Sequence, residues 1–123
     1  MQSEKLRHVF FKSLSFKRDA ERLNAWNEID RLKLFLDKNP EYGAVIPGGD
    51  GLRKIRMAIP GKGKRGGARV IYFQILDQCI FLIDVFAKNE KSDLRAIELK
   101  NAIEVRNGML IDYKEFYHGK NAR

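Results

Sequence analysis

The segment from residue 51 to residue 74 constrains the fold most, because two strand-like runs in it flank a glycine-rich loop. The first run, residues 52–59, alternates apolar with basic side chains: Ile55, Met57 and Ile59 against Lys54 and Arg56. A period of two predicts a strand with two unlike faces. If the apolar face packs on helices, Lys54 and Arg56 must lie on the opposite, open face.

The same segment also constrains the partner. It carries seven Lys or Arg side chains and no Asp or Glu. Each such cation can neutralise one phosphate and release its counterion, so the segment favours a nucleic-acid partner. The formal net charge of +8 over 123 residues extends this bias to the whole surface. On charge alone, acidic small molecules and anionic lipids remain open alternatives.

The N-terminal part of the chain predicts one strand and two helices. Residues 8–11 are short, apolar and β-prone, and residues 13–23 are polar enough for a surface helix. An apolar stripe then recurs at helical spacing from residue 24. Asn24 or Asn27 could cap this second helix, and Asn39-Pro40 should stop it.

The C-terminal part predicts two more strands and a last helix. Residues 69–75 and 79–86 are strand-like and flank an expected turn at Asp77-Gln78. The run at 79–86 is almost continuously apolar, which is typical of a central strand. Ser92 or Asp93 could cap the last helix, and Asn107-Gly108 should end it. We expect a single domain over residues 1–123, with a core of about residues 8–106 and an appendage at 107–123.

Several familiar sites are not expected. His8 and His118 each stand without a nearby Cys or second His, and the basic segment has no acidic metal cluster, so we predict no metal and no cofactor. Cys79 sits in an apolar run and is expected to be buried. No run is long and apolar enough to span a membrane, and the start does not read as a signal peptide, so we expect a cytoplasmic protein without a membrane partner.

Metal-free RNA cleavage would suit such a chain. The 2′-hydroxyl of the substrate attacks the adjacent phosphorus, so the protein must supply a base, an acid and cations for the developing charge. Four cations could converge on one face of the sheet for this purpose: Lys54, Arg56, Arg69 and Lys88. Residue chemistry alone favours the alternative, a basic surface that only binds nucleic acid.

Four motifs in a fixed order resemble the HigB branch of the RelE superfamily, the toxins of type II toxin–antitoxin modules. They are Asn39-Pro40-x-x-Gly43, then Val45-Ile46-Pro47-Gly48-x-x-Gly51-Leu52-Arg53-Lys54-Ile55-Arg56, then Gly61-x-Gly63-Lys64-Arg65-Gly66-Gly67-x-Arg69-Val70-Ile71-Tyr72, and Lys88-Asn89-Glu90-Lys91-x-Asp93-Leu94. The resemblance implies an α+β fold, with N-terminal helices packed on a small, mostly antiparallel four-stranded sheet and a C-terminal helix. It also implies an endoribonuclease that cuts mRNA in the ribosomal A site.

The resemblance implies roles for particular residues. Phosphate-contacting positions fall on Lys54 and Arg56, the arginine that stabilises the scissile phosphate falls on Arg69, and the basic position after the fourth strand falls on Lys88. Asn89 and Arg95 stand where some relatives have an arginine and a tyrosine, which leaves the general acid and base open among Lys54, Lys88, Glu90 and Tyr72. Further RNA contacts are expected at these residues: Arg53, Lys62, Lys64, Arg65 and Tyr72.

Some of these contacts have a plain alternative. Lys62, Lys64 and Arg65 could form a solvated turn, and Tyr72 could be an ordinary sheet tyrosine rather than a ring on which an RNA base stacks.

The implied partners are the ribosome, mRNA and a cognate antitoxin, expected to be of the helix-turn-helix type, with operator DNA reached only through the antitoxin complex. Two other functions remain open. One is a non-catalytic RNA- or DNA-binding module that uses the same basic face. The other is an antitoxin-binding protein that acts only as a transcriptional co-regulator.

Overall fold

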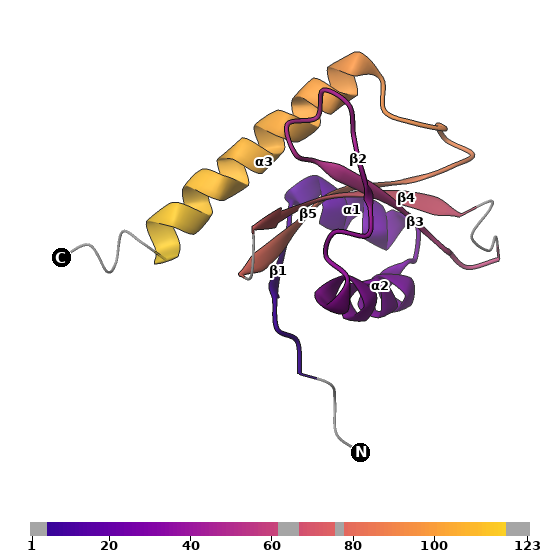
Figure 1. The fold of residues 1–123 in the computed structure, drawn as a ribbon. Coiled ribbons are helices and arrows are strands. Elements are labelled where there is room, and N and C mark those ends of the chain that lie inside the picture. Colours follow the sequence, from indigo (N-terminus) through magenta and orange to yellow (C-terminus); the bar gives the residue numbers. More distant parts are fainter. Residues whose placement is uncertain (1–4, 62–66, 76–77, 118–123) are drawn as a thin grey trace.

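The protein is a five-stranded sheet covered by helices on both faces (Figure 1). The computed structural model describes residues 5–61, 67–75 and 78–117. The strand order is β1-β5-β4-β3-β2, and every pairing is antiparallel except that of β1 with β5. The strands are β1 (Val9–Lys12), β2 (Ala44–Val45), β3 (Arg53–Met57), β4 (Ala68–Ile75) and β5 (Cys79–Ala87). The predicted α+β class is confirmed.

Two helices cover one face of the sheet. Helix α1 (Leu14–Arg22) begins at Ser13, whose hydroxyl accepts a hydrogen bond from the Phe16 N–H at 3.0 Å and donates to the Ile83 carbonyl at 2.7 Å. Helix α2 (Trp26–Lys38) ends before Asn39-Pro40, as the sequence predicts. The core between these helices and the sheet includes Phe16, Ile29, Leu36, Val70 and Leu82.

Helix α3 (Ala96–Tyr117) covers the other face. Its side chains pack on Ile71, Phe81 and Ile83 of the central strands β4 and β5. The central position predicted for β5 is confirmed, and its residues are buried on both faces except for half-buried Asp84. Cys79 lies in this second core, as predicted, and burial raises the pKa of its thiol to about 11.

Two predictions for the first half of the chain are wrong. The sheet has a fifth strand, β2, where four strands were expected, because Ala44 and Val45 pair with Lys54 and Arg53. Neither Asn24 nor Asn27 caps α2, which follows Ala25 without a side-chain cap. Asn24 instead takes a positive φ of 52° at the corner between α1 and α2, a conformation that asparagine tolerates.

The last helix also differs from its prediction at both ends. It starts at Ala96, so neither Ser92 nor Asp93 caps it; the Arg95 N–H instead donates to the Glu98 carboxylate at 2.8 Å. It continues through Asn107-Gly108 because Met109, Leu110 and Tyr113 pack against the second core. That burial outweighs the cost of about 1 kcal/mol for glycine inside a helix. Part of the predicted appendage, up to Tyr117, is therefore the second half of α3.

Candidate nucleic-acid interface and active site

The strand register brings three predicted site residues onto one face of the sheet. Arg56 on β3 is the partner of Arg69 on β4, and Arg69 is in turn the partner of Phe86 on β5. Lys54 lies two residues before Arg56, so its side chain leaves the same face. Phe86 belongs to the core beneath α3, which identifies this face as the one that α3 partly covers.

Lys88 joins the same end of the sheet. Its backbone N–H donates to the Gly67 carbonyl at 2.8 Å, which continues the β4–β5 ladder by one residue beyond Ala68 and Ala87. Because residues alternate between faces, this step places Lys88 on the side of Arg69. We call Lys54, Arg56, Arg69 and Lys88 the basic face.

The cations of the basic face differ in their partners. Lys54 Nζ pairs with Asp93 Oδ2 at 2.7 Å. Arg69 Nη1 is buried and has no hydrogen-bond partner within the described part of the chain. Arg56 and Lys88 are exposed and make no ion pair with any described residue. An arrangement of this kind, with like charges close together and a buried donor unused, is suited to receive an anion.

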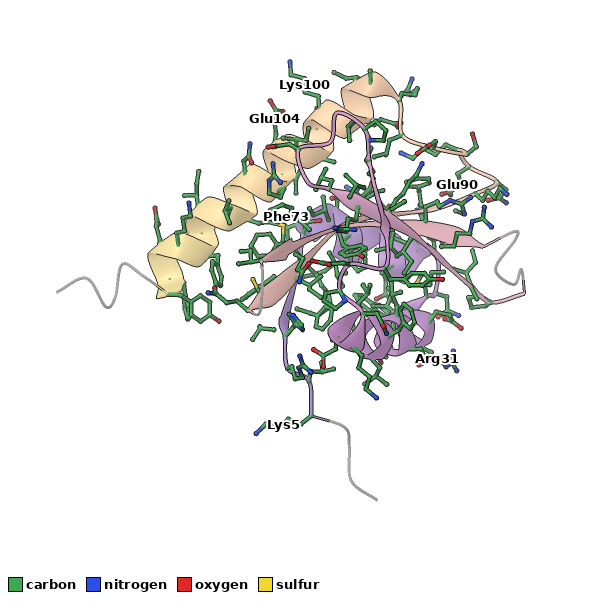
Figure 2. All side chains as sticks on the ribbon, in the orientation of Figure 1. Lys5, Arg31, Phe73, Glu90, Lys100 and Glu104 are labelled. Carbon is green, nitrogen blue, oxygen red and sulfur yellow. The ribbon has the colours of Figure 1, made fainter. Side chains whose placement is uncertain are left out.

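The segment between β5 and α3 crosses this end of the sheet, and ion pairs hold Glu90 and Lys91 within it. Glu90 pairs with both terminal nitrogens of Arg22 at the end of α1 and accepts from the Ala87 N–H at 3.2 Å. Lys91 pairs with Glu98 at 2.8 Å and lies 4.6 Å over the ring of Phe86. Figure 2 shows Glu90 where this segment leaves the sheet.

Glu90 is therefore engaged away from the basic face. The hydrogen bond from Arg22 lowers the pKa of its carboxyl group, with a smaller contribution from the Ala87 N–H. A carboxylate that is paired in this way is a poor proton donor near neutral pH. Glu90 thus has another partner in the structure, and its role as a general acid or base stays a prediction.

The structure corrects the prediction for Tyr72. Its ring is fully buried in the core on the α1 and α2 side, so no RNA base can stack on it. Its hydroxyl donates to the Pro40 carbonyl at 2.9 Å and accepts from the Gly43 N–H at 2.8 Å. Burial raises its pKa. The alternative of an ordinary sheet tyrosine is therefore correct, because helices cover both faces of the sheet.

Arg53 also lies apart from the basic face. It is the register partner of Tyr72, and its Nη1 donates to the carbonyls of Glu41 and Gly43 at 2.9 and 2.8 Å. Its guanidinium thus secures the segment before β2, and its predicted contact with RNA stays a prediction. Lys62, Lys64, Arg65 and His118 lie outside the described residues.

Two acidic residues near the site were not among the predicted site residues. Asp93 was interpreted only as a helix cap, because a contact with Lys54 across 39 positions leaves no local signal. Asp84 is half-buried on β5, opposite Ile71, and burial raises the pKa of its carboxyl group, while Lys91 acts in the opposite direction. A single charged residue inside an apolar strand was the available signal for Asp84.

A groove lies between α2 and the part of β3 that extends beyond its pairing with β2. It has a volume of about 730 Å³, and its walls include Glu28, Arg31, Phe35 and Tyr42. Lys54 and Arg56 line it as well, so the groove meets the basic face at the sheet edge. Within the described ranges no group of three His, Cys, Asp or Glu side chains is placed to hold a metal ion, and none of the described helices could cross a membrane.

A comparison with protein families identifies this architecture. Residues 41–115, more than half of the chain, match the family described as the RelE toxin of the RelE / RelB toxin–antitoxin system. The chain belongs to the RelE toxin family. The match spans β2 to β5 and most of α3, and so contains the whole basic face. The protein is thus a toxin of a toxin–antitoxin system, with an antitoxin as its partner, in a family whose toxins generally inhibit translation and are generally endoribonucleases.

Proposed function

We propose that this RelE-family toxin is a HigB-like, ribosome-dependent endoribonuclease that cuts mRNA in the A site. The observation that best supports the proposal is the basic face, above all the buried Arg69 Nη1 without a hydrogen-bond partner among the described residues. A guanidinium that lies next to a second guanidinium, that of Arg56, can hold two oxygens of one phosphate.

The proposed reaction uses the 2′-hydroxyl of the substrate. The 2′-oxygen attacks the neighbouring phosphorus and loses its proton to a base as the O2′–P bond forms. The P–O5′ bond breaks, and an acid protonates the leaving 5′-oxygen. The products are a 2′,3′-cyclic phosphate and a 5′-hydroxyl. Arg69 and Arg56 stabilise the extra negative charge on phosphorus in the transition state.

Lys54 and Lys88 are the proposed carriers of the two protons. Of the four groups that the sequence left open, Tyr72 is buried and Glu90 is paired with Arg22, whereas Lys88 is exposed and Lys54 lies on the basic face. The ribosome would supply the in-line geometry that a small basic surface does not impose on free RNA. Lys62, Lys64 and Arg65 are proposed to contact the RNA backbone.

The remaining proposals concern partners. We propose an antitoxin of the helix-turn-helix type, with operator DNA bound only through the toxin–antitoxin complex.

Programmed ribosomes provide the test. We expect EDTA-treated toxin to cut the A-site codon of a bound message as well as untreated toxin does. Neither preparation should cut the same message when ribosomes are omitted. Tight RNA binding without any cleavage would favour the non-catalytic binding module. Repression of a promoter by the toxin–antitoxin complex, with neither cleavage nor growth arrest by free toxin, would favour the co-regulator.

A further inference from the structure

A carboxylate occupies the basic face. Asp93 comes from the segment between β5 and α3, and its Oδ2 accepts a hydrogen bond from Lys54 Nζ at 2.7 Å. The charge of Arg69 is also near enough to act on this carboxylate: the hydrogen bond from Lys54 lowers the pKa of Asp93 most, and Arg69 adds to the effect. Asp93 therefore interacts with two of the four cations that would hold a phosphate.

The segment that carries Asp93 is anchored by two ion pairs. Glu90 fixes it to Arg22 of α1, and Lys91 fixes it to Glu98 in the first turn of α3. The backbone at Leu94 adds a further restraint, because its N–H donates to Asp93 Oδ1 at 2.8 Å. The carboxylate is thus held over Lys54 by contacts that do not depend on Lys54 itself.

The contact with Lys54 is nevertheless easy to break. The Asp93 side chain is 55% exposed and the Lys54 side chain 31% exposed. Ion pairs at such positions contribute about 0–1 kcal/mol, because water and salt screen them. A phosphodiester, which offers two charged oxygens to the same cations, can compete with a carboxylate held this weakly.

Asp93 does not use every hydrogen-bond donor that the basic face offers. Its two oxygens are used by Lys54 and by the Leu94 N–H, while Arg69 Nη1 stays buried and has no acceptor among the described residues. A tetrahedral phosphate group could bond to both cations at once, which the planar carboxylate does not do. The unused donor indicates that the anion for which the site is shaped is larger than a carboxylate.

We propose that Asp93 is an internal anion that occupies the phosphate site formed by Lys54 and Arg69, and that a phosphodiester of the substrate displaces it from Lys54. The carboxylate keeps Lys54 paired in the free toxin and lowers the affinity of the basic face for RNA. Naming the ligand as RNA rests on the proposed function, whereas the anion site itself rests on the geometry. Asp93 would thus control binding without taking part in the chemical step.

Binding to an uncleavable RNA tests this directly. The probe is a short RNA with a 2′-O-methyl group on every sugar. Fluorescence anisotropy at low salt measures its affinity for the toxin. We expect Asp93→Asn to bind about 3–5-fold more tightly, because it removes a competing charge worth up to about 1 kcal/mol and keeps the acceptor for the Leu94 N–H. The gain should shrink as salt is added.

A matched variant separates a local effect from net charge. Glu104→Gln also removes one negative charge, but Figure 2 shows Glu104 on the side of α3 that points away from the sheet. We expect it to change the affinity less than 2-fold at the same salt concentration, because screening weakens distant charges. In a Lys54→Met background, the effect of Asp93→Asn should also be lost, since the site to be vacated no longer exists.

Three results would overturn the inference: equal or weaker RNA binding by Asp93→Asn, the same gain for Glu104→Gln, or an undiminished gain in the Lys54→Met background. A second probe tests the anion site separately from the proposed function. Inorganic pyrophosphate, titrated into the wild-type toxin, should shift the carboxyl ¹³C resonance of Asp93 and leave that of Glu104 in place. If pyrophosphate shifts the Asp93 resonance but ribosomes show no cleavage, the proposed function fails and the anion site stands. If ribosomes show cleavage but Asp93 shows neither the RNA-binding effect nor the resonance shift, only the anion site is refuted.

Discussion

Arg56 and Arg69 are register partners on β3 and β4, so two guanidinium groups leave the same face of the sheet side by side. Like charges directly opposite each other on neighbouring strands are destabilising, by roughly 0.2–1 kcal/mol. Nothing described in the structure neutralises either arginine by a direct ion pair, and Asp93 acts on Arg69 only at longer range. A pair of this kind is costly for the fold alone, which favours a role in binding an anion.

We expect Arg69→Ala to abolish cleavage and toxicity while the protein stays folded. The variant loses a charge-assisted contact to the phosphate in the transition state, which should reduce the cleavage rate by about 10²-fold or more. The measurement is the single-turnover rate on programmed ribosomes, together with thermal unfolding. Unaltered growth arrest by normally expressed Arg69→Ala toxin would refute the assigned role.

Glu90→Gln should retain cleavage and lose a little stability. Its carboxylate is committed to Arg22 and to the Ala87 N–H, on the α1 side of the molecule. Because the pair is exposed, the free energy of unfolding should fall by less than about 1 kcal/mol. Arg22→Gln is the matched control and should cost a similar amount. A cleavage rate reduced 10²-fold in Glu90→Gln but not in Arg22→Gln would return Glu90 to the list of general acids and bases.

Tyr72→Phe should lower stability rather than RNA affinity. The variant leaves the Gly43 N–H without the acceptor it has at 2.8 Å and removes the bond to the Pro40 carbonyl, at a cost of about 1–3 kcal/mol. Urea unfolding measures the loss, and binding of the 2′-O-methyl RNA to the folded variant should match the wild type. Weaker RNA binding with unchanged stability would contradict the core role given to this ring.

The sequence predicted the strands well where the hydrophobic pattern was simple. Alternation identified β3 and its two faces, and the unbroken apolar run identified β5 as central. It predicted the boundaries poorly because they depend on distant contacts. Helix α3 continues past Asn107-Gly108 because Met109 and Tyr113 pack on the second core, and no local sequence pattern indicates that burial.

The candidate site was predicted only in part for the same reason. Strand parity was enough to place Lys54 and Arg56 on one face, since it depends on neighbouring positions alone. Arg69 joins them through the register of β3 with β4. Parity could not decide between the two readings of Tyr72, because it does not show that both faces of β4 are covered. The pairs Lys54–Asp93 and Arg22–Glu90 join residues 39 and 68 positions apart, so their existence depends on tertiary structure.

The lowered pKa of Glu98 predicts how the free energy of unfolding depends on pH. Hydrogen bonds from the Arg95 N–H and then from Lys91 lower the pKa of its carboxyl group from 4.5 to about 2. A carboxyl group with a lowered pKa in the folded state stabilises the protein above its unfolded pKa, and that contribution is lost as pH falls from about 4.5 through about 2. Glu98→Gln should therefore reduce stability at pH 6 and show a smaller further loss between pH 4.5 and pH 2 than the wild type, measured by urea unfolding. Glu104→Gln is the control and should follow the wild-type curve.

The 2′-hydroxyl mechanism makes the last prediction. A message with a single 2′-deoxy sugar at the scissile position has no attacking group, so it should resist cleavage on programmed ribosomes, while its all-ribose counterpart is cut to a 2′,3′-cyclic phosphate end. Both messages should bind the A site equally, because the deletion removes one oxygen and no charge. Addition of EDTA to the toxin should leave the product unchanged if the basic face alone stabilises the phosphorane. If the 2′-deoxy message were cut as fast as the ribose message, another nucleophile would have to be found, and Lys54 and Lys88 would lose their proposed roles in moving its proton.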